Sequence, residues 1–250
     1  MCGIAGFVND MPIDVKCPVL QRMTDMIAHR GPDSEGHYID EHAALGHRRL
    51  SIIDLGGGQQ PIYNEDGSKV ITFNGEIYNY QTLREELIAA GHTFTTKSDT
   101  EVLLHGYEQW GVDLLQRVRG MFTFVIWDKN KQELFGARDH FGIKPFYYAK
   151  MNGTFMYASE IKSLLRHPDF VKELNAEALK PYMTFQYPAI GETFFKGVYK
   201  LPEGHYFTYR DGKMDIHRYY DEDFREGKQK LGELVNSIDQ TVCDLSLIHI

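Results

Sequence analysis

The sequence predicts an α+β fold in which antiparallel sheets are covered by helices. Three pairs of short β-rich stretches are each joined by a tight turn, which is the pattern of β-hairpins. Few strand–helix–strand units are present, so a doubly wound parallel sheet is not favoured. A chain of 250 residues with 42% hydrophobic content is long enough to bury a large core. The hairpins are 121–127 with 133–137, 145–149 with 154–158 across Asn152-Gly153, and a third pair across Asp211-Gly212.

The first quarter of the chain predicts a strand, a helix and further strands. Residues 3–8 form a short apolar run, which we interpret as a buried strand that fixes residue 2 to the core. Residues 19–27 repeat apolar side chains at helical spacing, and the pattern stops before Gly31. Residues 51–53 and 70–73 are rich in β-branched side chains and lie on either side of glycine-rich turns, so we expect strands there.

Two helices are expected next. Residues 80–90 carry one apolar face that ends at Gly91. Ser98 and Glu101 have the spacing of a capping box, which predicts a second helix with Asp99 at its N-terminus.

The pattern changes after residue 220. Residues 221–230 are charged and linker-like, and residues 231–242 have one apolar helical face. We therefore predict a domain over residues 1–220, followed at 221–250 by a linker and the first helix of a domain that the chain does not include. We expect the chain to be truncated before that second domain.

Composition excludes several classes of function. The net charge is −8 with scattered Lys and Arg, which argues against nucleic-acid binding. Cys2, Cys17 and Cys243 are too dispersed for a disulfide framework or a zinc motif, and a reducing cytoplasm is the expected location. No signal peptide or run of about 18 apolar residues predicts membrane insertion. The histidines lack metal-ligand spacing with acidic partners, so no metal site is predicted.

Cys2 is the strongest candidate for chemistry. A methionine before a small residue is commonly removed, and its removal would place a thiol and an α-amino group on one residue. The amine, with a pKa of about 7.7 to 8.0, could accept the thiol proton and later return it to a leaving amine. A small residue at a frayed chain end is the simpler alternative, because isolated cysteines are usually inert.

The surrounding motifs carry a family resemblance. Residues 1–7, 29–33, 47–54 and 74–79 resemble, in order and spacing, motifs of the class II glutamine amidotransferases, which are N-terminal-nucleophile hydrolases. Within that family the sequence is similar to the glutaminase half of the B-type, glutamine-hydrolysing asparagine synthetases. The segments that support the narrower resemblance are 98–101, 120–122, 138–142, 158–162 and 201–205. The resemblance covers about residues 1–220 and implies a four-layer αββα fold, two stacked antiparallel sheets flanked by helices.

The resemblance also implies roles for particular residues. Asn74 and Gly75 would form an oxyanion hole. Arg49 would clamp the α-carboxylate of glutamine with its two-pronged guanidinium, and Glu76 and Asp99 would hold the α-ammonium. The resemblance further implies that the glutamine site is lined by residues that follow Arg49, namely Leu50, Ile52 and Ile53.

Simpler interpretations remain open for each of these. Arg49 could be a surface arginine, Asp99 could only stabilise its helix dipole, and Asn74-Gly75 could be a type I′ turn. Residues 29–33 are expected to shape the pocket wall or a loop over it, without a chemical step.

The implied reaction is glutamine hydrolysis through a Cys2 thioester. In a complete enzyme, ammonia would pass to a second domain that uses ATP and Mg²⁺ to amidate aspartate; this chain lacks the Ser-Gly-Gly-x-Asp-Ser loop of that domain. We therefore expect no cofactor in the chain itself, and a homodimer only by resemblance. The alternatives are phosphoribosyl-pyrophosphate or fructose-6-phosphate amidotransferases, hydrolases of bile-salt or penicillin amides, and a non-catalytic module that retains Met1.

Overall fold

The computed structural model describes the chain except for residues 52–53, 55, 188–190, 225–226, 228 and 248–250. The chain divides into two compact units, Met1–Tyr220 and Asp221–Ile250. The second unit contains the amphipathic helix α7 (Leu231–Leu247), which begins at the predicted residue. None of the helices in the described part of the chain is long and apolar enough to cross a membrane.

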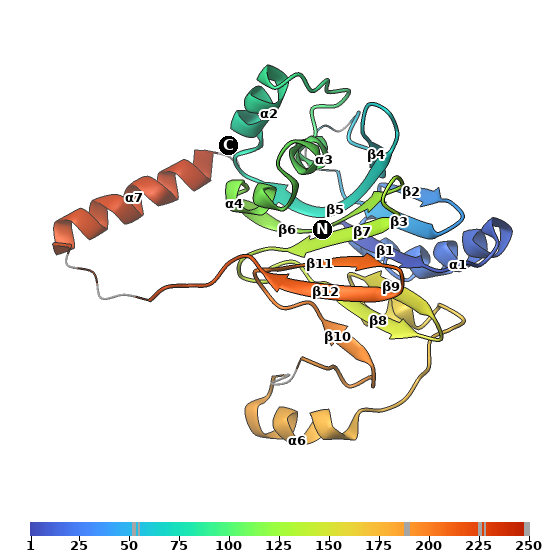
Figure 1. The fold of residues 1–250 in the computed structure, drawn as a ribbon. Helices are drawn as coiled ribbons and strands as arrows, with labels where there is room; N and C mark the ends of the chain where they lie inside the picture. The colour runs from blue at the N-terminus through green and yellow to red at the C-terminus, as the bar shows by residue number, and fades with distance from the viewer. Residues whose placement is uncertain (52–53, 55, 188–190, 225–226, 228, 248–250) are drawn as a thin grey trace. The chain divides into compact units, whose positions relative to one another are not determined.

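Two six-stranded sheets form the centre of the first unit (Figure 1). Every pairing between their strands is antiparallel. The first sheet has the order β10 (Val198–Lys200), β8 (Tyr147–Met151), β9 (Thr154–Ala158), β1 (Gly3–Val8), β3 (Ala43–Arg49) and β2 (Ser34–Ile39). The second has the order β12 (Lys213–Arg218), β11 (His205–Arg210), β7 (Glu133–Arg138), β6 (Gly120–Asp128), β5 (Lys69–Ile77) and β4 (Ile62–Tyr63).

Helices cover the outer face of each sheet. The first sheet packs against α1 (Ile13–Asp25) and α5 (Ile161–Leu164). The second packs against α2 (Tyr80–Ala89), α3 (Asp99–Trp110) and α4 (Leu114–Arg117). The described residues also include η1 (Ala28–Arg30), η2 (Gly111–Asp113) and α6 (Ala176–Phe185). The order helix, sheet, sheet, helix confirms the predicted αββα fold.

Strand periodicity explains why the layers hold together. In β6, Phe124 and Ile126 face the helices while Val125 and Trp127 face the other sheet, because successive side chains of a strand point to opposite faces. The layer between the sheets also contains Tyr157 and other large side chains from both sheets. Each fully buried side chain of this size contributes about 1.5 to 3 kcal/mol, and a register slip of one residue would expose them.

The predicted hairpins are confirmed. Asn152 and Gly153 have φ of 50° and 83°, and Asp211 and Gly212 have φ of 50° and 71°, as a two-residue type I′ turn requires. The helix predicted at 19–27 begins earlier, at Ile13; the apolar residues of its first turn, Ile13 and Val15, are 48% and 41% exposed and do not continue the buried face. Ser51 is not in a strand, and the rest of the strand expected at 51–53 lies outside the described residues.

Candidate active site

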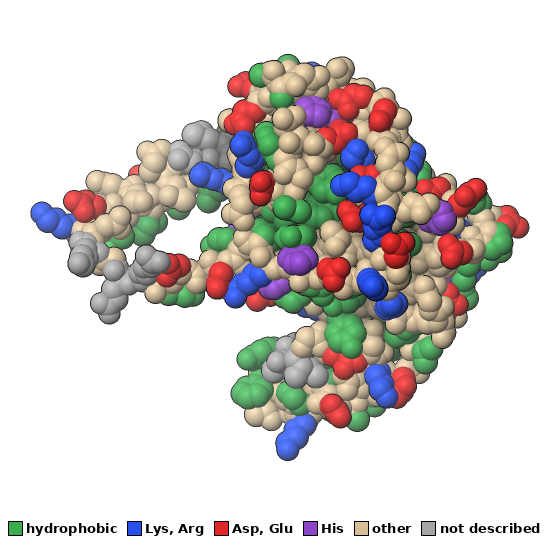
Figure 2. All heavy atoms as spheres, viewed as in Figure 1, with side chains coloured by type: hydrophobic (Ala, Val, Ile, Leu, Met, Phe, Trp, Pro, Cys, Tyr) green, Lys and Arg blue, Asp and Glu red, His purple; other side chains and the backbone are tan. Residues whose placement is uncertain are grey.

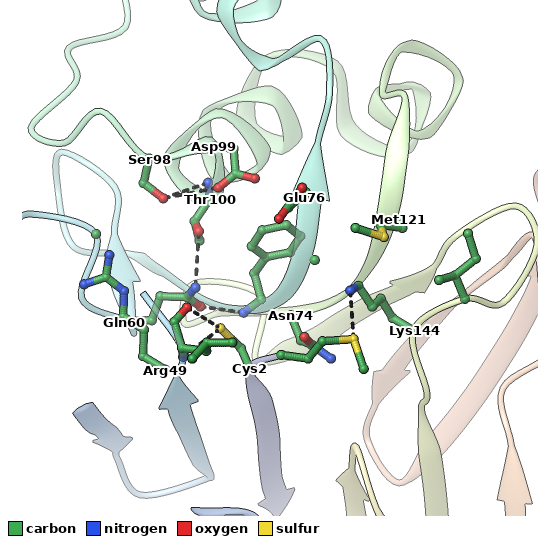
Figure 3. A pocket seen from close by; sticks show the side chains of 16 residues that line it. Cys2, Arg49, Gln60, Asn74, Glu76, Ser98, Asp99, Thr100, Met121 and Lys144 are labelled. Carbon is green, nitrogen blue, oxygen red and sulfur yellow. Dashed lines mark hydrogen bonds between the residues drawn. The ribbon is translucent and has the colours of Figure 1, made fainter. Parts of the chain in front are cut away.

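A cavity of about 230 Å³ opens where β1, β3, β5 and the N-terminus of α3 converge (Figure 3). This volume is below the range of about 300 to 1,000 Å³ of drug-sized ligand sites, so it suits a ligand as small as an amino acid. Every predicted site residue that the structure describes lines this cavity: Cys2, Arg49, Leu50, Asn74, Gly75, Glu76 and Asp99. Ile52 and Ile53, predicted beside Arg49, lie outside the described residues.

The thiol of Cys2 lies against the backbone of Leu50. Cys2 Sγ is 3.5 Å from the Leu50 carbonyl oxygen and 3.3 Å from its backbone nitrogen. Burial raises the pKa of the Cys2 thiol, and the hydrogen bond to Leu50, the chain-terminal amine and Arg49 only partly offset this. The partly buried thiol therefore needs a base before it can attack. The nearest amine in sequence belongs to Met1, which also lines the cavity.

A loop behind Cys2 fixes its backbone. Arg30 Nε donates to the Cys2 carbonyl oxygen at 2.9 Å, and Arg30 Nη1 donates to Glu160 at 3.0 Å. Gly31 lies so close to β3 that a Cβ atom there would be 2.3 Å from the Arg48 carbonyl. Residues 29–33, expected to form the pocket wall, thus hold the Cys2 segment from behind instead of lining the described cavity.

Asn74 and Gly75 are consecutive residues of β5, so the interpretation of this pair as a hairpin turn is wrong. Asn74 is 1% exposed, and its Nδ2 atom has no hydrogen-bond partner within the described part of the protein. A buried amide donor without an acceptor costs about 1 to 3 kcal/mol, so a ligand oxygen in the cavity would relieve it. A Cβ atom on Gly75 would lie 2.2 Å from the Met121 carbonyl, which is why this position requires glycine.

Arg49 ends β3 and is only 7% exposed, so it is not a surface arginine. Its Nη2 donates to the Asp54 carbonyl at 2.6 Å. A Cβ atom on Gly58 would lie 2.8 Å from the same nitrogen. The glycine-rich turn therefore leaves room for the guanidinium at the cavity wall.

Two carboxylates, those of Glu76 and Asp99, lie across the cavity from Cys2 and Asn74. In Figure 3 the two acids are in the upper part of the view, whereas Cys2 and Asn74 are in the lower part. Asp99 is 5% exposed and its Oδ2 accepts from the Ile77 backbone at 3.0 Å. Burial raises the pKa of Asp99 to about 6; the Ile77 hydrogen bond lowers it and the negative charge of Glu76 raises it. A cationic ligand between the two acids would stabilise both as carboxylates.

Helix α3 begins at Asp99 as predicted, but only half of the capping box forms. Ser98 Oγ accepts from the Thr100 backbone at 3.1 Å. The Glu101 carboxylate does not return to Ser98; it accepts from the backbone N–H groups of Thr95 and Thr96 at 2.7 and 2.6 Å. Asp99 therefore serves both as a first-turn acid of α3 and as an acceptor for β5.

The sequence did not reveal two residues that line the cavity. Gln60 joins β5 to α3, since its Oε1 accepts from the Phe73 backbone at 2.6 Å and its Nε2 donates to Thr100 Oγ1 at 3.2 Å. Lys144 is 4% exposed and its Nζ donates to Met1 Sδ at 3.2 Å. Burial lowers the pKa of Lys144, while Glu76 raises it.

The sequence contains a weak indication of Lys144, because this residue lies two positions after segment 138–142, which supports the family resemblance. Arg138 Nε donates to the Lys144 carbonyl at 2.7 Å, and Asp139 Oδ2 accepts from the Lys144 backbone at 3.0 Å. That segment therefore positions the lysine at the cavity.

The chain resembles known proteins over most of its length. Residues 1–220 match the glutamine amidotransferase domain family. The chain is 44% identical to asparagine synthetase [glutamine-hydrolyzing] 1 of Bacillus subtilis over 253 residues, covering 100% of this chain and 40% of that protein. It is 44% identical over 214 residues to asparagine synthetase [glutamine-hydrolyzing] 2 of the same organism, covering 82% of this chain and 28% of that protein.

A solved structure supports the fold independently. Glutamine phosphoribosylpyrophosphate amidotransferase from B. subtilis superposes with a TM-score of 0.65 at 16% identity, covering 88% of this chain and 50% of that one. At that identity the likeness concerns the fold alone. The chain spans 40% or less of the length of the two asparagine synthetases above.

Proposed function

This chain belongs to the glutamine amidotransferase domain family, and from that premise we propose that Cys2 carries out its glutamine hydrolysis once Met1 has been removed. The products are glutamate and ammonia. The observation that carries the proposal is the buried Nδ2 of Asn74, a hydrogen-bond donor that lines the Cys2 cavity and has no acceptor among the described residues.

The proposed reaction has two halves. The α-amine of Cys2 takes the thiol proton, and Sγ attacks the side-chain amide carbon of glutamine. Asn74 Nδ2 and the Gly75 backbone N–H donate to the oxygen that becomes negative. The amine then gives its proton to the amide nitrogen, the C–N bond breaks, and ammonia leaves a thioester. Water, deprotonated by the same amine, attacks the thioester; glutamate leaves and the proton returns to sulfur.

The remaining charges orient the substrate. Arg49 faces the α-carboxylate, for which its planar pair of donors is suited. Glu76 and Asp99 face the α-ammonium, which replaces water around both acids. The cavity thus has a cationic wall for the α-carboxylate of glutamine and an anionic wall for its α-ammonium. The thiol faces the side-chain amide.

The role in a whole protein is a further part of the proposal. Both asparagine synthetases named above are more than twice as long as this chain. We propose that residues 221–250 lead into a second domain, in which ATP and Mg²⁺ support amidation of aspartate by the ammonia released here. A homodimer and a cytoplasmic location belong to the same proposal.

The test uses the purified chain with methionine removal confirmed by intact mass. A diazo-oxo analogue of glutamine should add one label to Cys2, and Cys2→Ala should abolish both labelling and glutamine hydrolysis. Cys17→Ser is the matched control, because Cys17 is an exposed thiol on α1. Hydrolysis that survives in Cys2→Ala, or label found on Cys17, would refute the assignment.

A further inference from the structure

Four histidine and glutamate side chains form a second polar group near β4 and α3. None of the four lines the Cys2 cavity. The group comprises Glu65 after β4, His92 between α2 and α3, and His105 and Glu108 on α3. One donor atom from each of the four lies within 4.8 Å of the others. In Figure 2 a histidine lies among acidic side chains over α2 and α3, at the top of the view.

The donor separations match a tetrahedral metal site. His105 Nδ1 is 3.0 Å from Glu108 Oε2 and 3.5 Å from Glu65 Oε2. His92 Nδ1 is 3.4 Å from Glu65 Oε1. Four ligands at zinc's usual distance of about 2.0 to 2.1 Å in a tetrahedron lie about 3.3 Å apart. These three separations are therefore close to the spacing that zinc requires, and all four donors lie within 4.8 Å of one another.

Both imidazoles present the same nitrogen to the cluster. His92 Nε2 faces Gln109 Oε1 at 3.2 Å, so the amide oxygen accepts the proton of that nitrogen. His105 is 1% exposed; its Nε2 has no hydrogen-bond partner in the described chain and lies 3.6 Å from the Glu101 carboxylate. In His92 the acceptor at Nε2 leaves the lone pair on Nδ1, the nitrogen that faces the cluster and would bind a metal.

The acids are held in place as well. Asn64 Nδ2 donates to Glu108 Oε1 at 2.6 Å, which leaves Oε2 for the cluster. The Thr93 backbone donates to Glu65 Oε1 at 3.1 Å. These contacts from outside the cluster orient carboxylates in the way that supporting residues orient metal ligands.

We propose that Glu65, His92, His105 and Glu108 bind one divalent transition-metal ion, with Zn²⁺ preferred. Two imidazoles and two carboxylates suit zinc, and the two negative charges neutralise the ion. A closed set of four protein ligands is typical of a structural site. The ion would join the segment after β4, the α2–α3 loop and α3, the helix that carries Asp99 at its N-terminus. An adjoining cavity of about 610 Å³, lined by Glu65 and His105, provides a route of entry.

The sequence predicted no metal site because no two histidines are spaced for one; the fold brings the donors together from three segments. A protonated His105 that is paired with the same acids, without any metal, is the competing interpretation. The two differ in whether the cluster holds zinc in solution.

The experiment is a zinc titration of the full chain by calorimetry after chelator treatment. Cys2→Ala, Cys17→Ser and Cys243→Ser together form the background, because thiols bind zinc themselves. The expected result is one Zn²⁺ per chain, a higher melting temperature with zinc, and visible absorption typical of tetrahedral Co²⁺ on cobalt loading. Absence of one-equivalent binding in this background would overturn the proposal.

Variants localise the ion. In the same background, His92→Gln and Glu65→Gln should each weaken zinc binding more than tenfold; the side chain of Glu65 is 40% exposed and that of His92 15%, and neither belongs to a hydrophobic core cluster. His42→Gln is the matched control: His42 also contacts an acid, Asp10 at 3.3 Å, outside the cluster, and its loss should leave zinc affinity unchanged. Equal affinity in all three variants would place the ion elsewhere and refute the site.

Discussion

The Cys2 cavity differs from the cluster of Glu65, His92, His105 and Glu108 in how its polar groups are partnered. In the cavity, Asn74 Nδ2 is buried without an acceptor and Asp99 is a buried acid whose pKa burial raises to about 6. In the cluster, the imidazoles and carboxylates contact one another at 3.0 to 3.5 Å. The cavity therefore suits an organic molecule with its own charges and oxygen atoms, whereas the side chains of the cluster already partner one another and suit a compact cation.

Among substitutions that keep the Cys2 thiol, removal of the oxyanion donor should have the largest effect on catalysis. Asn74→Ala should lower kcat about 10² to 10³-fold, because one preorganised donor to the developing oxyanion is worth that much. Steady-state kinetics of ammonia release measures the effect. The matched control is Asn64→Ala, which removes an amide beside the cluster and should leave kcat near its original value. A comparable loss in both variants would mean that the two regions are not functionally separate.

Replacement of the arginine clamp should act on substrate binding. Arg49→Lys keeps the positive charge but loses the planar pair of donors, so we expect KM for glutamine to rise more than tenfold with a smaller change in kcat. Arg48→Lys is the matched control, since Arg48 forms an ion pair with Glu35 instead of lining the cavity. An unchanged KM in Arg49→Lys would contradict the clamp.

The pKa of Asp99 predicts a pH dependence of binding. The folded pKa of about 6 is above the ordinary value of 3.8, so the fold favours the protonated acid, and stability is lost as pH rises from about 3.8 through about 6. The α-ammonium of glutamine binds to the ionised carboxylate of Asp99. Affinity is therefore fully present above pH 6 and is lost as pH falls through 6, by up to about tenfold per pH unit.

The pH profile of KM, recorded from pH 5 to 8, checks this sign. Asp99→Asn should have a high KM at every pH and should lose the step near pH 6. If the step persists in Asp99→Asn, another group controls binding.

Variation within the cluster should have the smallest effect on catalysis. His92→Gln removes a donor that does not line the Cys2 cavity, so we expect kcat and KM to stay within about twofold while zinc no longer raises the melting temperature. Parallel measurement of glutaminase kinetics and thermal unfolding tests both halves. A strong loss of kcat at unchanged stability would show that the cluster is coupled to the chemistry.

The same comparison explains how much could be predicted from sequence. Hairpins with Asn-Gly and Asp-Gly turns, and the start of α3 at Asp99 after the capping residue Ser98, depend on neighbouring residues and were predictable. The cavity was largely predictable because the motifs that carry the family resemblance, such as Asn74-Gly75-Glu76, are short contiguous segments that line it. Gln60 acts through partners far along the chain, so no local pattern reveals it. The segment 29–33 was expected at the pocket, but the contact of Arg30 with the Cys2 carbonyl was not predictable for the same reason.

The cluster was not predictable for the same reason. Its ligands come from a loop after a two-residue strand, a helix–helix loop and one face of α3. Only the packing of α2 and α3 on the second sheet gives them a common centre.

The most direct test of the central claim compares two forms of the chain that differ at one end. In one form methionine removal is complete by intact mass; in the other, a lysine inserted between Met1 and Cys2 prevents it. We predict that the first form hydrolyses glutamine and that the second, with the same thiol but no amine on Cys2, is at least about 10²-fold slower. Equal rates in the two forms would contradict the account, because the amine would then not be the base.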